Sequence, residues 1–378
     1  MAHPAPLSSS LAKAARTIEP VTAIEAFHLK IPLRRPYRLS LGTLEAFESV
    51  VVRMRAGDHV ASGEATELPG YFSERIDDVW RLVLEEAPLL VGKEIPEAIS
   101  ALGRLGDRPF PLTPLLTPLE TLGGIGPILS ACERPIPLVA TVQAEEEDDL
   151  AEEIARFHTE GYRTLKVKVG GSHARDLRYV KRVQRLADSD FTIRIDANQG
   201  CTFTEAEALL AAMDPAIVEH FEQPFPPDRW EEMATLQRTA RVPLMLDESI
   251  RGREDLERVI QTGCAGVVKF KLMRAGGFRA LAELIGRARQ AGLSVILGNG
   301  VATDLGCLQE ARLAISMGLT ERAGEMNGFL KASRSILTEP LRVERGVLRL
   351  PAEAAELLDP LAIREFAVES RRWGAGIG

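Results

Sequence analysis

Hydrophobic patterning divides the chain into two parts with different periods. Over residues 22–66, three runs alternate apolar and polar residues and are separated by Pro-Tyr and Gly-Asp turns, which predicts a three-stranded antiparallel meander. Over residues 73–105 the apolar side chains recur at helical spacing, as at Val79 and Val83. We therefore expect a small α+β domain that ends near Arg134, within a Gly/Pro-rich stretch.

After this stretch, short apolar runs alternate with amphipathic segments such as 147–160, 174–186 and 204–213, which we predict to be helices. The predicted strands are 138–143, 164–169, 192–196, 217–222, 243–247, 266–271, 293–297 and 322–326. Eight strands that alternate with helices predict a parallel (β/α)8 barrel. An open doubly wound sheet is the alternative, and it is disfavoured because no strand is followed by a phosphate-binding glycine turn.

The two ends of the chain have their own patterns. Residues 1–18 contain Pro, Ser and Ala without a basic start and an apolar core, so we expect a loose tail there and no signal sequence. Near the other end, residues 341–344 and 347–350 flank Arg-Gly and predict a hairpin, which we expect to leave the barrel and pack elsewhere.

Composition narrows the class of protein. The 378 residues are 45% hydrophobic and 26% charged, which is typical of a globular chain with two domains or one large barrel with an appendage. The net charge of -8 disfavours nucleic acid and anionic membrane surfaces as partners. No apolar run approaches the ~18 residues of a spanning helix. The four cysteines are scattered singly, as in a reducing compartment, so we expect a cytoplasmic protein.

Charged residues lie at the C-terminal ends of five successive predicted strands. They are Lys168, Asp196, Glu222, Asp247 and Lys271, separated by 24 to 28 residues. Barrel enzymes carry their active sites at this end. Because neighbouring residues of a strand point to opposite faces, the apolar residues that face the helices turn these charged side chains toward the barrel axis.

The same alternation places Lys166 beside Lys168 and Lys269 beside Lys271, on strands that lie opposite each other in a ring of eight. A purely structural salt-bridge network is the alternative interpretation. It is disfavoured because burying charges costs several kcal/mol per ion, whereas hydrophobic residues would serve the fold as well. The like charge of Lys166 is expected to lower the pKa of Lys168 toward that of a useful base.

The three carboxylates indicate a particular metal. Asp196, Glu222 and Asp247 come from neighbouring strands without a histidine or cysteine among them. Such hard oxygen ligands suit Mg²⁺ and disfavour zinc. A metal ion there would bind a substrate carboxylate and stabilise the charge that forms when the adjacent carbon loses a proton.

These motifs resemble the enolase superfamily, and within it the muconate lactonizing (muconate cycloisomerase) subgroup. They are Lys166-Val-Lys168, Asp196-Ala-Asn198, Glu222-Gln-Pro224, Asp247-Glu-Ser249 and Lys271-Leu-Met-Arg-Ala-Gly-Gly277, in the family's order. The resemblance implies a modified (β/α)8 TIM barrel with an N-terminal α+β capping domain that the C-terminal segment completes. We accordingly expect the tail at 1–18, the capping domain at 19–134, the barrel at 135–338 and the returning segment at 339–378.

The resemblance also implies roles for individual residues. Asp196, Glu222 and Asp247 would bind Mg²⁺, for which Mn²⁺ is a possible substitute. Lys168 and Lys271 would be acid/base catalysts on the two faces of the substrate, with Lys166 tuning Lys168. Residues that would orient these groups or contact substrate are Asn198, Glu248 and Glu325, the last resembling a glutamate of the muconate cycloisomerases.

Departures from the family pattern concern specificity. Lys269 stands where the family often has Asn, and Gly324-Glu-Met-Asn327 lacks the Asp-x-Asp of the dipeptide epimerases, which disfavours that activity. All six histidines precede Glu222, which excludes the branch that uses a histidine from the seventh strand. We expect substrate choice to lie in loops 36–43 and 68–72, where the aromatic residues Tyr37, Tyr71 and Phe72 could line a pocket.

The sequence therefore predicts an Mg²⁺-dependent enzyme that abstracts the proton α to a carboxylate through a metal-stabilised enediolate. Cycloisomerase and racemase or epimerase of a small carboxylic acid are the favoured activities, and a homo-oligomer is expected. Three alternatives stay open. They are a syn-dehydratase on the same scaffold, a barrel lyase with a Schiff base on Lys168 or Lys271, and a non-catalytic relative.

Overall fold

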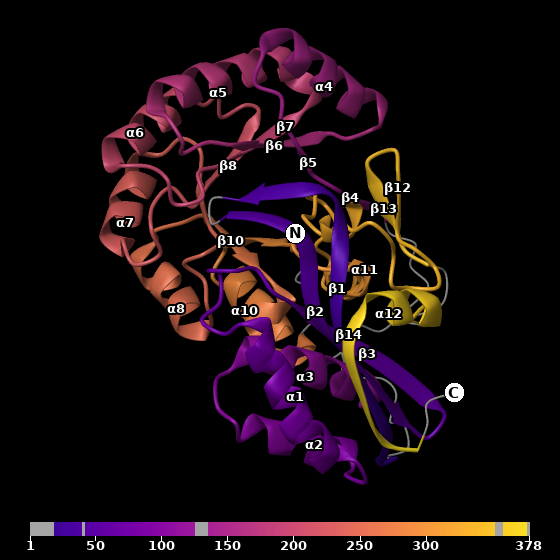
Figure 1. The fold of residues 1–378 in the computed structure, drawn as a ribbon. Helices are drawn as coiled ribbons and strands as arrows, with labels where there is room; N and C mark the ends of the chain where they lie inside the picture. The colour runs from indigo at the N-terminus through magenta and orange to yellow at the C-terminus, as the bar shows by residue number, and fades with distance from the viewer. Residues whose placement is uncertain (1–18, 40–41, 125–134, 352–357, 376–378) are drawn as a thin grey trace.

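The structure, a computed structural model, describes residues 19–39, 42–124, 135–351 and 358–375 (Figure 1). The predicted tail at 1–18 and the predicted domain end near Arg134 lie outside the described residues. Within the described ranges, two large hydrophobic clusters form the core, one under an antiparallel sheet and one around a parallel sheet.

The N-terminal part is built on a four-stranded antiparallel sheet with the strand order β14-β1-β2-β3. The predicted meander is confirmed as β1 (Val21–Leu39), β2 (Gly42–Ala56) and β3 (His59–Thr66). The last strand of the chain, β14 (Ala367–Gly374), pairs with β1 and completes the sheet. Residues near both ends of the sequence therefore lie side by side in one sheet.

Helices α1 (Ile76–Leu90), α2 (Ile95–Gly103) and α3 (Pro109–Leu122) accompany this sheet. The sequence did not predict α3, because it contains Pro114 and Pro118, which normally interrupt helices. The helix lies so close to the sheet that a Cβ on Gly63 would come within 2.8 Å of the Pro114 carbonyl oxygen. Glycine at 63 thus permits the contact between helix and sheet.

The second sheet is parallel, and its seven strands follow one another in sequence order from β5 to β11. This order differs from that of a doubly wound sheet, in which the strand order reverses at a switch point. The strands are β5 (Ala140–Thr141), β6 (Thr164–Lys168), β7 (Thr192–Asp196), β8 (Val218–Glu222), β9 (Leu244–Leu246), β10 (Val267–Phe270) and β11 (Ser294–Leu297). Figure 1 shows the helices curving around the outside of this sheet.

The helices between and after these strands include the three predicted ones, with ends that differ by at most one residue from the prediction. They are α4 (Glu147–Thr159), α5 (His173–Ala187), α6 (Phe203–Ala212), α7 (Trp230–Thr239), α8 (Arg253–Thr262), α9 (Leu272–Ala275), α10 (Phe278–Gln290) and α11 (Asp304–Ser316). None of the helices in the described ranges combines the length and the apolar character that crossing a membrane requires.

The predicted eighth strand, 322–326, does not form a strand. The ring closes there through an isolated parallel bridge between Leu138 and Gly324. The Gly324 N–H donates to the Pro137 carbonyl at 2.8 Å, and the Glu325 N–H donates to Leu297, the last residue of β11, at 3.1 Å. The prediction was wrong because an apolar run indicates burial, whereas a strand also needs neighbours that continue a hydrogen-bond ladder.

The C-terminal hairpin forms as β12 (Arg342–Glu344) and β13 (Val347–Arg349), but the prediction that it leaves the barrel was wrong. Strand β13 pairs with β4 (Ile136–Pro137), which lies just before the first barrel strand. A Cβ on Gly346 would come within 2.5 Å of the Gly161 carbonyl oxygen, so the turn packs closely on the loop after α4. The chain reaches the first sheet only later, through α12 (Pro360–Phe366) and β14.

Two carboxylates of the N-terminal part fasten it to helices of the barrel. Glu64 on β3 accepts a hydrogen bond from the Thr303 N–H at 3.0 Å, at the start of α11. Glu120 on α3 accepts one from the Phe278 N–H at 2.5 Å, at the start of α10. Burial raises the pKa of both carboxyl groups to about 7, despite these hydrogen bonds.

In Figure 1 the β1–β2 hairpin extends across the ring of barrel elements, where it can cover the C-terminal ends of the strands.

Candidate active site

The strand-end charges point into the barrel as the alternation predicts. Parallel register aligns Lys168 with Asp196, and Asp196 with Glu222. Asp247 and Lys271 each follow the last residue of a strand, β9 and β10. All of these side chains are buried except that of Lys168, which is 39% exposed. The charges form two layers, which we call the buried layer and the mouth layer.

The buried layer joins the lysines on opposite sides of the barrel through shared carboxylates. Lys166 Nζ lies 2.6 Å from a carboxylate oxygen of Glu222 and 3.0 Å from one of Glu325. Lys269 Nζ lies 3.1 Å from the other oxygen of Glu222 and 2.6 Å from the same oxygen of Glu325. Lys269 is therefore a structural partner of Glu222 and Glu325, a role that the sequence analysis did not predict.

Glu325 also connects this layer to Arg194, a residue that the sequence analysis missed. Arg194 is completely buried, and its Nη1 donates to Glu325 at 3.2 Å while its Nε donates to Glu219 at 2.7 Å. Glu219 in turn pairs with Arg322 at 3.1 Å. Arg194 has the same parity as Asp196 in β7, so strand alternation would have turned it inward as well.

The mouth layer lies at the ends of the strands. Lys168 Nζ donates to Asn198 Oδ1 at 2.5 Å and lies 3.4 Å from Asp196 Oδ2. Asn198 has a φ of 41°, a left-handed conformation, and its amide donates to Glu248 at 3.3 Å. Lys271 Nζ lies 2.6 Å and 2.8 Å from the two carboxylate oxygens of Asp247. Each mouth lysine is thus held beside an aspartate that the sequence predicts to be a metal ligand.

Two tyrosines from the predicted specificity loops reach this layer. The Tyr71 hydroxyl donates to Asp247 at 2.5 Å, and the Lys271 ammonium lies 4.0 Å from the centre of the Tyr71 ring. Tyr37 lies with its ring centre 4.7 Å from Lys331 Nζ. Phe72, the third predicted aromatic, stacks on Phe110 of the N-terminal part at 4.1 Å.

The two mouth lysines have opposite pKa shifts. Burial lowers the pKa of Lys271 and outweighs the attraction of Asp247, and the nearby charge of Lys269 acts in the same direction as burial. Burial is the largest influence on Lys168 and acts to lower its pKa, but Asp196, Tyr37 and Glu222 together outweigh it and the pKa is raised. The prediction of a lowered pKa for Lys168 was therefore wrong. It neglected Asp196, which lies beside Lys168 and also neutralises Lys166 at 2.9 Å.

The chemistry of the three acids fits a hard divalent cation. In the part of the chain that the structure describes, no group of three or more His, Cys, Asp or Glu is arranged as a ready metal site, and each predicted ligand pairs with lysine instead. The donors are nonetheless buried oxygens only. Burial and the neighbouring Asp196 raise the pKa of Glu222 to about 7, and Glu248 Oε2 is buried without a hydrogen-bond partner among the described residues. A dication would compensate this concentration of carboxylates, so the residues fit Mg²⁺.

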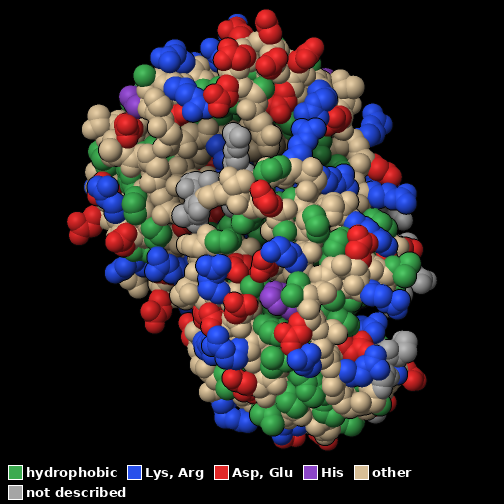
Figure 2. Space-filling model, in the orientation of Figure 1, with side chains coloured by type: hydrophobic (Ala, Val, Ile, Leu, Met, Phe, Trp, Pro, Cys, Tyr) green, Lys and Arg blue, Asp and Glu red, His purple; other side chains and the backbone are tan. Residues whose placement is uncertain are grey.

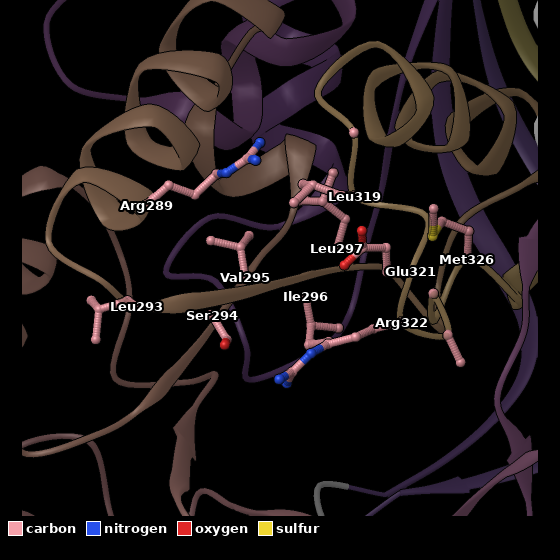
Figure 3. Close-up of a pocket in the computed structure, with 13 residues that line it drawn as sticks. Arg289, Leu293, Ser294, Val295, Ile296, Leu297, Leu319, Glu321, Arg322 and Met326 are labelled. Atoms are coloured by element: carbon pink, nitrogen blue, oxygen red, sulfur yellow. The ribbon is translucent and has the colours of Figure 1, made fainter. Parts of the chain in front are cut away.

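A cavity of about 220 Å³ lies along β11, between this strand and residues 318–326 (Figure 3). Its lining includes Ser294, at the start of β11, and Arg322. None of the residues predicted for the active site lines it. On the face shown in Figure 2, acidic side chains gather at the top of the view, and over the rest of this face basic and acidic side chains are interspersed.

Comparisons with known proteins agree with this arrangement. Residues 149–354 match the family model described as enolase C-terminal domain-like. A D-Ala-D/L-Ala epimerase from Cytophaga hutchinsonii is 26% identical over 78% of this chain and 83% of its own. Muconate cycloisomerase 1-2 from Acinetobacter lwoffii is 28% identical over 88% of this chain and 90% of its own. The o-succinylbenzoate synthase of Geobacillus kaustophilus is 28% identical over 86% of this chain and 89% of its own.

Solved structures agree on the fold. The muconate lactonizing enzyme from Pseudomonas fluorescens, complexed with muconolactone, superposes with a TM-score of 0.81 at 23% identity, covering 93% of this chain and 100% of that one. The dipeptide epimerase from Cytophaga hutchinsonii, complexed with Mg and D-Ala-L-Val, superposes with a TM-score of 0.83 at 24% identity. This match covers 93% of this chain and 99% of that one. The fold is thus a TIM-barrel-like α/β fold with a capping domain, and the chain belongs to the enolase superfamily, among relatives that are cycloisomerases, racemases and epimerases.

Proposed function

We propose that this protein is an Mg²⁺-dependent isomerase that abstracts the proton α to the carboxylate of a small carboxylic acid. The general reaction class is that of its relatives. The observation that carries the finer proposal is the mouth layer, in which Lys168 and Lys271 lie at the ends of β6 and β10, on opposite sides of the barrel, with Asp196, Glu222 and Asp247 on the strands between them.

In this proposal Asp196, Glu222 and Asp247 hold the Mg²⁺ ion, and Mn²⁺ is a possible substitute. Bound there, the ion would supply positive charge to the substrate carboxylate and so stabilise the negative charge that spreads onto it when the α-proton leaves. Glu248 and Asn198 would orient these ligands and Lys168 through the hydrogen bond between them.

The two lysines would move protons on opposite faces of the α-carbon. Burial lowers the pKa of Lys271, which makes its neutral amine accessible as a base. Burial acts to lower the pKa of Lys168, but Asp196, Tyr37 and Glu222 together raise it, so Lys168 stays protonated and can donate from the other face. With the opposite enantiomer the two lysines would exchange these roles. Removal on one face and return on the other inverts the α-carbon, which favours racemisation or epimerisation. The cycloisomerase reaction would use the same lysines, with the proton delivered to a different carbon.

A lyase is the second candidate. Elimination of a leaving group would use the same proton abstraction, and the o-succinylbenzoate synthase relative supports it. We also propose a cytoplasmic location, which is supported by the three cysteines Cys201, Cys264 and Cys307, all buried and free in the described residues.

The test is exchange of the α-hydrogen for deuterium in D₂O by the Mg²⁺-loaded protein. The candidate substrates are a library of N-acyl amino acids, dipeptides, acid sugars and lactones. Mass spectrometry measures the exchange, and chiral chromatography measures any inversion. We expect exchange with at least one class and its loss on chelation of the metal. Metal-independent trapping of a substrate by borohydride would support a Schiff-base lyase instead, and a metal-loaded protein that exchanges no substrate would contradict the proposal.

A further inference from the structure

Lys331 is a lysine at the barrel mouth that the proposed mechanism does not use. It follows the short helix η3 (Gly328–Leu330), beyond the point where the barrel closes. Its Nζ donates to the Gly300 carbonyl at 2.9 Å and to Asn327 Oδ1 at 3.1 Å. Its own carbonyl accepts a hydrogen bond from the Arg34 N–H on β1 at 2.9 Å. Both its backbone and its ammonium group are therefore fixed in position.

The ammonium group lies beside Tyr37 and within electrostatic reach of Lys168. Lys331 Nζ lies 4.7 Å from the centre of the Tyr37 ring. Burial would raise the pKa of Tyr37, but the charges of Lys331 and Lys168 outweigh it and the pKa is lowered. Tyr37 is thus within electrostatic reach of both lysines, which places Lys331 on the Lys168 side of the mouth.

Lys331 differs from the other lysines of the mouth and the buried layer in its partners. Lys166, Lys168, Lys269 and Lys271 each have a carboxylate oxygen within 4.0 Å. Within the described ranges, Lys331 has none, and its hydrogen bonds go to a backbone carbonyl and an amide. Burial lowers the pKa of Lys331 and outweighs Tyr37, the group that acts most strongly to raise it. A partly buried cation without a counter-charge costs free energy that a bound anion would recover.

We propose that Lys331 is a specificity-determining residue that binds a distal carboxylate of the substrate, so that the enzyme prefers dicarboxylates to monocarboxylates of the same shape. This inference rests on the proposed function, because it assigns the first carboxylate to the metal ligands. The second carboxylate then extends past Lys168 and Tyr37 toward Lys331. Because the ammonium group is already held by Gly300 and Asn327, little conformational entropy is lost when the anion binds.

The test measures binding, which needs no turnover. The Mg²⁺-loaded protein is titrated by calorimetry with unreactive straight-chain dicarboxylates of four to seven carbons and with the matching monocarboxylates. We expect the best-fitting dicarboxylate to bind about tenfold to a hundredfold more tightly than its monocarboxylate, as for a hydrogen bond to a charged group. Lys331→Met is expected to bring this ratio close to one, whereas Lys331→Arg retains part of it.

Lys181→Met is the matched control, because Lys181 is an exposed lysine on α5 and its loss changes the net charge equally. If Lys331→Met does not fold, Lys331→Gln is used in its place, since its amide can still donate to the Gly300 carbonyl. A ratio that is unchanged in these variants, or a wild-type protein without preference at any length, would overturn the inference and leave Lys331 as a structural partner of Tyr37. Failure of deuterium exchange with intact dicarboxylate preference would refute the proposed function alone.

Discussion

The buried layer and the mouth layer of the barrel are built from the same residue types but differ in how their charges are compensated. In the buried layer, Lys166 and Lys269 share Glu222 and Glu325, so each ammonium group contacts at least two carboxylates. In the mouth layer, Lys168 and Lys271 each contact one carboxylate, and their other hydrogen-bond partners are the neutral groups of Asn198 and Tyr71. The buried layer is therefore suited to hold the strands together, and the mouth layer is suited to exchange partners with a ligand.

Substituting the mouth lysines should give the largest effect. We expect Lys271→Ala and Lys168→Ala each to reduce α-deuterium exchange by about 10²–10⁴-fold, because each removes one of the two proposed proton-transfer groups. With a chiral substrate, the two variants should fail on opposite enantiomers. Exchange rates measured by mass spectrometry for each enantiomer test this, with circular dichroism as the control for folding. Equal residual activity on both enantiomers in both variants would contradict the assignment of opposite faces.

Substituting a lysine of the buried layer should instead destabilise the fold. Lys269→Met leaves Glu222 and Glu325 with one ammonium partner fewer at a buried site, so we expect the free energy of unfolding to fall by about 3–5 kcal/mol. Lys168→Met is the matched control, and it should lose less than about 1 kcal/mol because Lys168 is partly exposed. Urea unfolding followed by circular dichroism measures both. Equal losses in the two variants would remove the distinction between the layers.

A smaller effect on stability is expected from Glu64, a buried carboxyl group without a lysine partner among the described residues. Glu325 is the contrasting case, because lysines hold its pKa well below the usual range although burial opposes them. Burial raises the pKa of Glu64 to about 7, above the usual 4.5. The folded state therefore binds a proton at Glu64 more tightly than the unfolded state does. The resulting stability is present below pH 4.5 and is lost as the pH rises through 7.

Glu64→Gln should make this loss smaller, because the amide is neutral at every pH. We expect the melting temperature of the wild-type protein to fall between pH 5.5 and pH 8, and the fall to be about 2–4 °C smaller in Glu64→Gln. Differential scanning calorimetry at constant ionic strength measures it. Glu48→Gln, at a half-buried surface site, is the matched control and should keep the wild-type slope. A variant slope equal to that of the wild type would show that Glu64 does not bind the proton.

The sequence was informative wherever a property depends on neighbouring residues in one strand. Alternation within β6 and β10 placed four lysines inside the barrel, and the ends of β7 and β8 placed Asp196 and Glu222 there. The resemblance to the enolase superfamily added the capping domain and the family's reaction class. Both were confirmed, whereas the roles of the individual site residues stay predictions.

The features that the sequence did not reveal depend on residues far apart in the chain. Tyr71 and Asp247 meet only when the two parts are assembled, and Lys269 and Glu325 meet only when the barrel closes. No local period records such pairs. The raised pKa of Lys168 has the same origin, because it depends on Asp196 from the next strand. Helix α3 was missed for a different reason, since its prolines are compatible with helix only where packing against the sheet outweighs the lost hydrogen bonds.

The isolated bridge between Leu138 and Gly324 has a consequence for how the barrel moves. In the described residues, β5 to β11 are joined by ladders of at least two paired residues each. The segment that closes the ring has only this single bridge on one side and the hydrogen bond from Glu325 to Leu297 on the other. The seam adjoins Glu325 and, a few residues on, Lys331. The wall of the barrel therefore has its fewest backbone hydrogen bonds beside the residues that we expect to meet the distal end of the substrate, so a shift of this side would break fewer of them than a shift elsewhere in the ring.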